Sequence, residues 1–142
     1  EEAVQRYAKA AAGSDPAPLL DAVEALHGRF EEQFRIVRPS MKELGAYHVG
    51  LYQVFHRFLP GRDLPALRAM VDTMEVRCAG LAAAEPPRWF KGDRAALDQG
   101  RTDLCVRTRE LKGVAAGSDW SRIQAAVDAV HGQYQKLEAL FE

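Results

Sequence analysis

Apolar side chains recur every three or four residues through five long segments, and this spacing limits the fold more than any other feature. It is the period of an α-helix with one buried face, and no segment has the two-residue alternation of a half-buried strand. The pattern therefore predicts an all-α protein. The segments cover residues 17–37, 41–59, 64–84, 93–115 and 119–141, and residues 1–12 have the pattern of the end of a further helix. The stripe of the first long segment consists of Leu19, Val23, Leu26, Phe30, Phe34 and Val37.

Turn signals separate these segments. Gly13-Ser14-Asp15-Pro16 has the form of a helix end, an N-cap and a proline in the first turn, and Gly117-Ser118-Asp119 repeats it. Ser40-Met41-Lys42-Glu43 matches a capping box, and Asp63 and Asp93 stand where N-caps are expected. Because the connections are short, consecutive helices should run antiparallel. We therefore expect an up-down bundle of four to six helices.

One turn-plus-helix unit occurs twice in the chain. Residues 11–30 and 115–134 are identical at ten of twenty positions, at a constant offset of 104 residues that runs from Ala11 to Ala115. The match covers the turn and the start of the following helix, including His27 and His131. We interpret it as an internal duplication with units of about 11–34 and 115–138. Residues 1–142 are nevertheless expected to form a single domain, because the length is that of one domain.

Charge and motifs limit the possible functions. The formal net charge is −1 and basic residues alternate with acidic ones, so a nucleic-acid-binding surface is not expected. No apolar run approaches the ~20 residues of a membrane span. Ser14, Ser40 and Ser118 stand at helix starts, and the chain has no phosphate-binding glycine loop and no nucleophile elbow. These observations favour a protein that is not an enzyme.

The two cysteines, Cys78 and Cys105, fit neither a CxxC motif nor a zinc pattern. If the ends of neighbouring helices are level, the two residues differ in height by about 9 Å. That separation favours two buried thiols over a disulfide. A disulfide would instead indicate an oxidising compartment.

The four histidines are His27, His48, His56 and His131. Counting from the turns puts His27 and His48 about 3 Å apart in height, and His131 has the same place in its repeat as His27. Three imidazoles could therefore converge at mid-height, with Glu31 one turn after His27 as a fourth ligand. Imidazole is a common ligand of zinc and copper, and bundles build metal sites from inward side chains at one level. One shared site and two pseudo-equivalent sites, one in each repeat copy, both fit.

His56 lies about 12 Å along the helix from His48, so it is expected away from that level, as a possible second site. Two alternatives remain for the histidines. They could be structural, in a metal-free scaffold or interaction module that binds a protein partner or forms a homodimer. They could also serve an iron or non-covalent haem bundle with Met70 or Met74, since the chain lacks a CxxCH motif. Other aromatic residues are interpreted as packing residues: Tyr47, Tyr52 and Tyr134 at helix seams, and Trp89-Phe90 as a lid over the end of the bundle.

Three segments carry a resemblance to a known kind of protein: Leu26-His27-x-x-Phe30, Tyr47-His48-x-x-Leu51-Tyr52-x-x-Phe55-His56-x-x-Leu59-Pro60 and Val130-His131-x-x-Tyr134. They resemble poorly characterised exported bacterial helical-bundle proteins, whose helices repeat Leu-His-x-x-Phe, often with a second histidine four residues later. The resemblance implies a periplasmic or secreted protein, histidine-rich seams that act as metal sites, and a bundle similar to cytochrome c′ without its haem motif. This chain departs from the pattern at Glu31 and Gln135, where the second histidine would stand, and glutamine is a poor ligand.

The sequence thus predicts an exported, non-enzymatic helical bundle that binds zinc or copper. The expected ligands are His27, Glu31, His48 and His131, with His56 as a possible second site.

Overall fold

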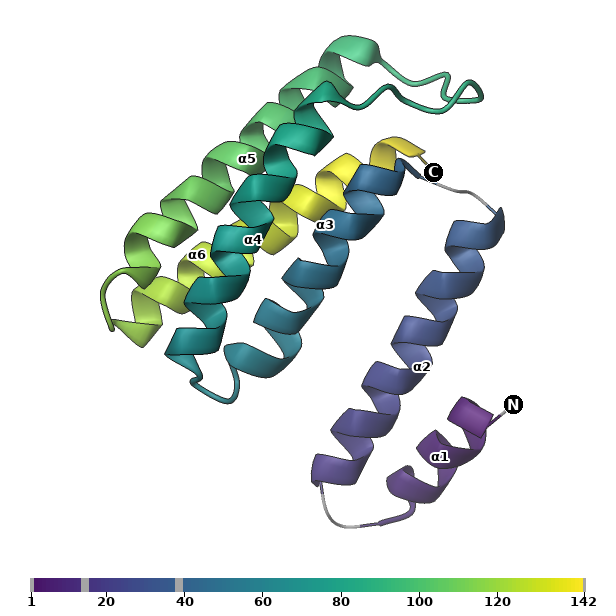
Figure 1. Cartoon of the computed structure of the whole chain (residues 1–142). Coiled ribbons are helices and arrows are strands. Elements are labelled where there is room, and N and C mark those ends of the chain that lie inside the picture. The colour runs from purple at the N-terminus through teal and green to yellow at the C-terminus, as the bar shows by residue number, and fades with distance from the viewer. Residues whose placement is uncertain (1, 14–15, 38–39, 142) are drawn as a thin grey trace. The chain divides into compact units, whose positions relative to one another are not determined.

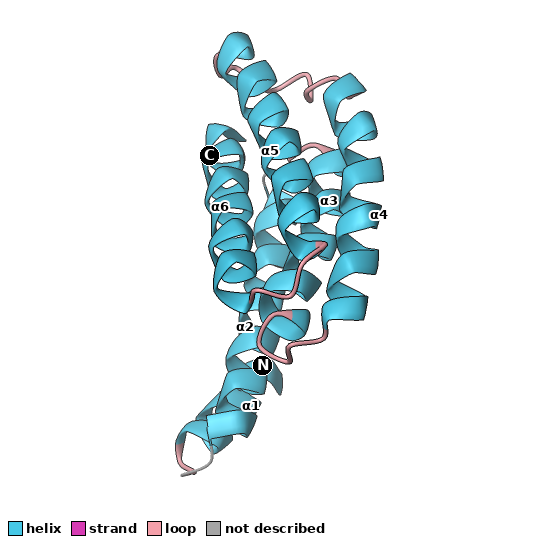
Figure 2. Cartoon of the chain, turned by 90° about the vertical axis from the view of Figure 1, so that its left-hand side faces the viewer, coloured by secondary structure: helices cyan, strands magenta, loops and turns pink. Residues whose placement is uncertain are grey.

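The computed structural model of the chain describes residues 2–13, 16–37 and 40–141. In the helix over 16–37, the side chains at 16–17, 20, 24, 31–32 and 34–37 lie outside the described part. The described residues form helices, turns and loops, with no strand among them (Figure 2). The prediction of an all-α helical bundle is confirmed.

The chain divides into two compact units, residues 1–39 and residues 40–142, and each is described here by itself. The first unit is a helical hairpin, in which α1 (Glu2–Ala11) packs on α2 (Pro16–Val37) (Figure 1). That residues 1–142 form a single domain stays a prediction.

The second unit is an antiparallel bundle of four helices (Figure 1). It consists of α3 (Lys42–Gln53), α4 (Leu64–Ala83), α5 (Arg94–Ala115) and α6 (Trp120–Glu138). The π-helical turn η1 (Val54–Phe58) extends α3, and the 3-10 turn η2 (Ala139–Phe141) extends α6. With these extensions, each helix begins and ends within one residue of the segment that the apolar spacing predicts.

Aspartate side chains start three of the four helices of this bundle. The carboxylate of Asp63 accepts a hydrogen bond from the backbone N–H of Ala66 at 3.1 Å. Asp93 and Asp119 each accept from two backbone N–H groups of the following turn. These caps satisfy donors that have no partner within the helix, which is why the helices begin where they do. By contrast, α3 begins at Lys42 with Met41 as its N-cap, one residue later than the capping box predicts.

Tyr47 lies at the centre of the four-helix core, where the interpretation as a seam residue is wrong. Its side chain is fully buried, and its hydroxyl lies 2.6 Å from Oγ1 of Thr108 on α5. The Thr108 hydroxyl in turn donates to the carbonyl of Leu104 at 2.8 Å, so the Tyr47 hydroxyl is the donor of the pair. Burial raises the pKa of Tyr47, because ionisation would place an unsolvated charge in the core.

Two arginines bind the carbonyl-rich ends of neighbouring helices. Arg68 of α4 donates to the carbonyls of Ala115, Ala116 and Gly117 at the end of α5. Arg101 of α5, which is buried, donates to the carbonyls of Leu81 and Ala84 at the end of α4 and pairs with Asp98. A cation at a helix C-terminus stabilises the unpaired carbonyls and the negative end of the helix dipole.

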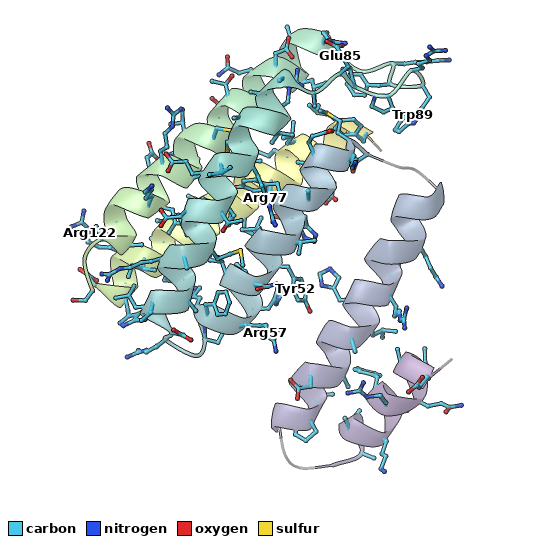
Figure 3. All side chains as sticks on the ribbon, viewed as in Figure 1. Tyr52, Arg57, Arg77, Glu85, Trp89 and Arg122 are labelled. Atoms are coloured by element: carbon cyan, nitrogen blue, oxygen red, sulfur yellow. A yellow bond between two sulfur atoms is a disulfide. The ribbon has the colours of Figure 1, made fainter. Side chains whose placement is uncertain are left out.

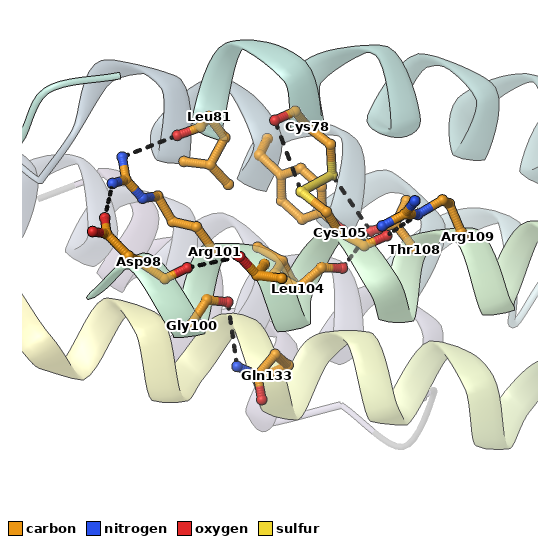
Figure 4. The surroundings of a disulfide bond; sticks show 12 residues. Cys78, Leu81, Asp98, Gly100, Arg101, Leu104, Cys105, Thr108, Arg109 and Gln133 are labelled. Carbon is orange, nitrogen blue, oxygen red and sulfur yellow. Dashed lines mark hydrogen bonds and ion pairs between the residues drawn. A yellow bond between two sulfur atoms is a disulfide. The ribbon is translucent and has the colours of Figure 1, made fainter. Parts of the chain in front are cut away.

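Cys78 of α4 and Cys105 of α5 form a disulfide, with their Cα atoms 5.6 Å apart (Figure 4). The prediction of two separate thiols is therefore wrong. That prediction places the end of α4 and the start of α5 at the same height. In the structure the loop of residues 84–93 lets α5 begin beyond the end of α4 (Figure 1). The overhang amounts to about six residues, or about 9 Å, and brings the two cysteines to one height.

The loop of residues 84–93 closes over one end of the four-helix unit. The ring of Phe90 lies 5.0 Å from the ring of Phe141, and the ring of Trp89 lies 6.2 Å from it. An ion pair of 2.6 Å between Glu85 and Arg94 joins the two ends of the loop. The lid interpretation of Trp89-Phe90 agrees with these contacts, although the Trp89 side chain stays partly exposed near the tip of the loop (Figure 3).

Candidate functional site

Two of the predicted ligands, His48 and His131, lie on the same side of the four-helix unit. The imidazole of His48 on α3 stacks on the ring of Tyr134 on α6, with centroids 4.6 Å apart and planes at 18°. The imidazole of His131 on α6 stacks on the ring of Phe55 in η1, at 4.3 Å and 22°. Each histidine therefore reaches across from its own helix to an aromatic residue of the antiparallel partner.

His56 belongs to the same group of side chains. Its ring lies 4.6 Å from Tyr52 and 5.0 Å from Phe55. His56 reaches this group through Tyr52, which is four residues before it and four residues after His48. The expected separation of His48 and His56 along the helix therefore stays a prediction. The turn that carries His56 is π-helical, with the N–H of Leu59 bonded to the carbonyl five residues earlier.

These six residues form a continuous chain of ring contacts between α3 with η1 and α6, and we call it the histidine seam. Tyr52 joins the two halves of this chain, because its ring lies near both His48, at 6.3 Å, and His56. His48 and Tyr134 are buried, and the other four side chains are partly buried. The Tyr134 hydroxyl donates to Glu138 Oε1 at 2.6 Å, which fixes the ring on which His48 stacks. The histidine seam comprises His48, Tyr52, Phe55, His56, His131 and Tyr134.

His48 and His131 share the seam but are not at one height. His48 stacks on Tyr134, which is three residues after His131 on α6, a rise of about 4.5 Å. Within the described residues, no three histidine, cysteine, aspartate or glutamate side chains lie close enough together to hold a metal ion. A metal with three protein ligands in the seam would therefore need a ligand from outside the described side chains, or a movement of the stacked rings.

The other two predicted ligands lie on α2 in the first unit. His27 is exposed within the described structure, and the Glu31 side chain lies outside the described part. The structure therefore does not test whether His27 and Glu31 approach His48 and His131. The shared site with three histidines at one level stays a prediction.

Met70 and Met74, the candidate haem ligands besides histidine, lie where α4 approaches α3. A Cβ atom built on Gly50 would lie 2.9 Å from Cγ of Met74 and 3.2 Å from Sδ of Met70. Gly50 is two residues from His48, so the methionines contact roughly the opposite side of α3. The described residues thus do not bring these methionines together with the seam histidines.

Two polar side chains on the buried face of α5, Thr108 and Arg101, are not part of the predicted site. Thr108 occupies a position of the buried stripe of α5, and a polar residue at such a position indicates a buried hydrogen bond. Arg101 likewise occupies a position on the buried face of α5 where an apolar residue would be expected. Their partners, Tyr47 and the end of α4, could not be inferred from spacing because they are far away in the sequence.

Comparisons bear on the wider class of the protein. Over the part of the chain that the structure describes, no helix combines the length and the hydropathy of a membrane-spanning segment. The chain matches no protein-family model, no curated protein and no solved structure.

Proposed function

We propose that the chain is an exported, non-enzymatic helical-bundle protein that binds zinc or copper through histidines at its helix seams. The observation that carries this proposal is the histidine seam, in which three of the four histidines of the chain join one group of ring contacts. Imidazole suits both metals, and facing helices of a bundle are a common support for metal ligands.

We assign the ligands as two pseudo-equivalent sites. His48 and His131 belong to the site of the four-helix unit, with His56 nearby as a possible further ligand. His27 and Glu31 belong to the corresponding site of the α1–α2 unit, because His27 has the same place in its repeat as His131. This assignment needs no contact between the two units, unlike the shared site.

The Cys78–Cys105 disulfide supports the proposal of export. Disulfides persist in oxidising compartments such as the bacterial periplasm or the extracellular space, and they are rare in the cytosol. A periplasmic or secreted location also fits the resemblance to exported bundle proteins. The proposal of location can be tested separately, by fractionating cells and asking whether the two cysteines resist alkylation before reduction.

Metal binding is tested on full-length protein prepared without a histidine tag, stripped with a chelator and titrated with zinc and with copper by calorimetry. His48→Gln and His131→Gln should each weaken binding at least tenfold, and Gln135→Ala, one turn after His131, should leave it unchanged. Gln135→His should tighten zinc binding at least tenfold, because it places a second imidazole one turn from the first. Far-UV circular dichroism shows whether each variant is folded. Binding no tighter than micromolar, together with no gain in Gln135→His, would overturn the proposal.

A metal-free scaffold or interaction module is the second candidate, and one observation favours it. Each seam histidine is in contact with an aromatic ring, so the imidazoles already have a packing role. If this role is the whole function, His48→Gln and His131→Gln lower the thermal midpoint equally with and without metal. A metal-dependent rise of the midpoint in the parent protein alone would reject this candidate, since only a ligand that binds the folded state stabilises it.

A further inference from the structure

The α1–α2 hairpin exposes large apolar side chains on both of its helices. Val4 is 55 % exposed and Tyr7 38 % on α1, while Val23 is 40 % exposed and Phe30 65 % on α2. Val4 and Phe30, with Leu26, also line a hollow between the two helices. Val23 and Phe30 belong to the stripe that the sequence predicts to be buried, so this part of the core prediction does not hold within the hairpin.

The hairpin and the pair α5–α6 have the same layout at the offset of 104 residues. α1 ends at Ala11 and α5 at Ala115, and α2 covers Pro16–Val37 where α6 and η2 cover residues 120–141. The two turns also contain the same two backbone hydrogen bonds. These run from Gly13 to Ala10 and from Gly117 to Val114, both at 3.1 Å, and from Ala12 to Ala8 and from Ala116 to Lys112.

Every exposed large apolar residue of the hairpin has a buried counterpart in the four-helix unit at this offset. The counterparts of Val4, Tyr7, Val23 and Phe30 are Thr108 (0 % exposed), Leu111 (0 %), Val127 (0 %) and Tyr134 (2 %). Sequence identity ends upstream of Ala11, yet the correspondence of apolar and buried positions continues into α1. At these four positions the hairpin carries large apolar side chains that match buried positions of α5–α6 but are themselves substantially exposed. The match is not complete, because buried Leu137 corresponds to the exposed Gln33.

In the four-helix unit, α3 and α4 cover that face. Tyr47 of α3 binds Thr108 of α5, and His48 of α3 stacks on Tyr134 of α6. Cys78 of α4 lies against Thr108 and is bonded to Cys105 of α5. The four-helix unit, residues 40–142, is also almost as long as the 104-residue offset. The offset is thus the length of one complete four-helix module.

We infer that α1 and α2 are the last two helices of a second four-helix module of the kind that residues 40–142 form. Their exposed face is the docking site for a helix pair equivalent to α3 and α4 that belongs to that second module. The α3–α4 pair of residues 40–142 does not fill this role, because it already covers α5 and α6. The inference makes the chain part of a tandem array of modules, and it does not depend on metal binding.

Hydrogen exchange of the full chain tests whether the face is open. Amides of α2 should exchange at least about 100-fold faster than the corresponding amides of α6, because a hairpin alone buries too little to resist local opening. Equal protection in a monomer would overturn the inference, since the face would then be covered within the chain. Equal protection in a dimer, identified by sedimentation, would also overturn it, since the occupant would be a second copy of this chain.

A transplant tests whether α2 is built for the place that α6 occupies. In the full chain, residues 120–134 are replaced by the sequence of residues 16–30, which keeps the register of the offset. The thermal midpoint should fall by no more than about 15 °C, as expected for exchanges of one apolar residue for another. The matched control inserts residues 18–32 instead, which keeps a proline at the first position but turns the apolar stripe by about 200°. This control should lose its cooperative transition, and a transplant that unfolds like the control would overturn the inference.

Discussion

The turns that follow α1 and α5 are built alike, but the helices around them differ in what covers them. Both turns have the same backbone hydrogen bonds, and α2 and α6 begin at matching positions. Even so, Val127 is buried between helices while Val23 is substantially exposed. The comparison separates two effects that are usually seen together. Local sequence decides where a helix begins and which face is apolar, whereas burial of that face depends on the helices available to pack on it.

Leu111 and Tyr7, which correspond at the offset of 104 residues, provide the most direct test of this difference in burial. Leu111→Ala should lower the free energy of unfolding by about 2–5 kcal/mol, because Leu111 is fully buried and its loss leaves a cavity. Tyr7→Ala, the matched variant in α1, should change it by less than about 0.5 kcal/mol. Urea unfolding followed by circular dichroism measures both. Similar losses in the two variants would mean that α1 is packed as tightly as α5.

The disulfide provides the next largest effect, and it should be confined to the four-helix unit. Replacing both Cys78 and Cys105 with alanine should lower the free energy of unfolding of that unit by about 2–4 kcal/mol, because the bond closes a loop of 27 residues in the unfolded chain. Hydrogen exchange of the variant should rise across α3 to α6 and stay unchanged in α1 and α2. A matching rise in the hairpin would show that the two units unfold together.

The smallest effect concerns the buried pair of Tyr47 and Thr108. Tyr47→Phe should cost about 1 kcal/mol at neutral pH, since one buried hydrogen bond is lost while Thr108 keeps its bond to Leu104. The pKa of Tyr47 is raised in the folded state, so its contribution is complete below the unfolded pKa of about 10 and is lost as the pH rises above it. Between pH 10 and 11, stability should therefore fall less steeply in Tyr47→Phe than in the parent. Equal slopes in urea titrations would contradict this reading of the Tyr47 environment.

The helices could be predicted from the sequence to within one residue because their signals are local. Asp63, Asp93 and Asp119 act on backbone N–H groups two or three residues away, and apolar spacing reports the helical period directly. The height of α5 against α4 has no such local signal, because the ten residues of loop 84–93 can connect helices at many offsets. Counting from level helix ends therefore puts Cys105 about 9 Å from the height of Cys78, which is too far for a disulfide.

The candidate site could be predicted only in part, for a related reason. His48 and His131 were expected on facing helices, and they do meet the same seam. The contacts of His56 with Tyr52 and Phe55 are local, whereas the contact of Phe55 with His131 joins two helices that are far apart in the sequence. The π-helical turn over Val54–Phe58 has no signal in the apolar spacing. The prediction for His27 and Glu31 stays open, since a contact between separate units depends on surfaces far apart in the sequence.

The loop of residues 84–93 lies between the two cysteines of the disulfide, and this order has a consequence for how the protein is degraded. The loop is largely exposed, with Trp89 and the basic residues Arg88 and Lys91 near its tip, and such loops are preferred sites of protease attack. A single cut there leaves α4 and α5 joined through sulfur. The nicked molecule keeps both fragments in one covalent assembly until a reductant breaks the disulfide. The two fragments then separate on a gel run after reduction, whereas a gel run without a reductant keeps them in one band.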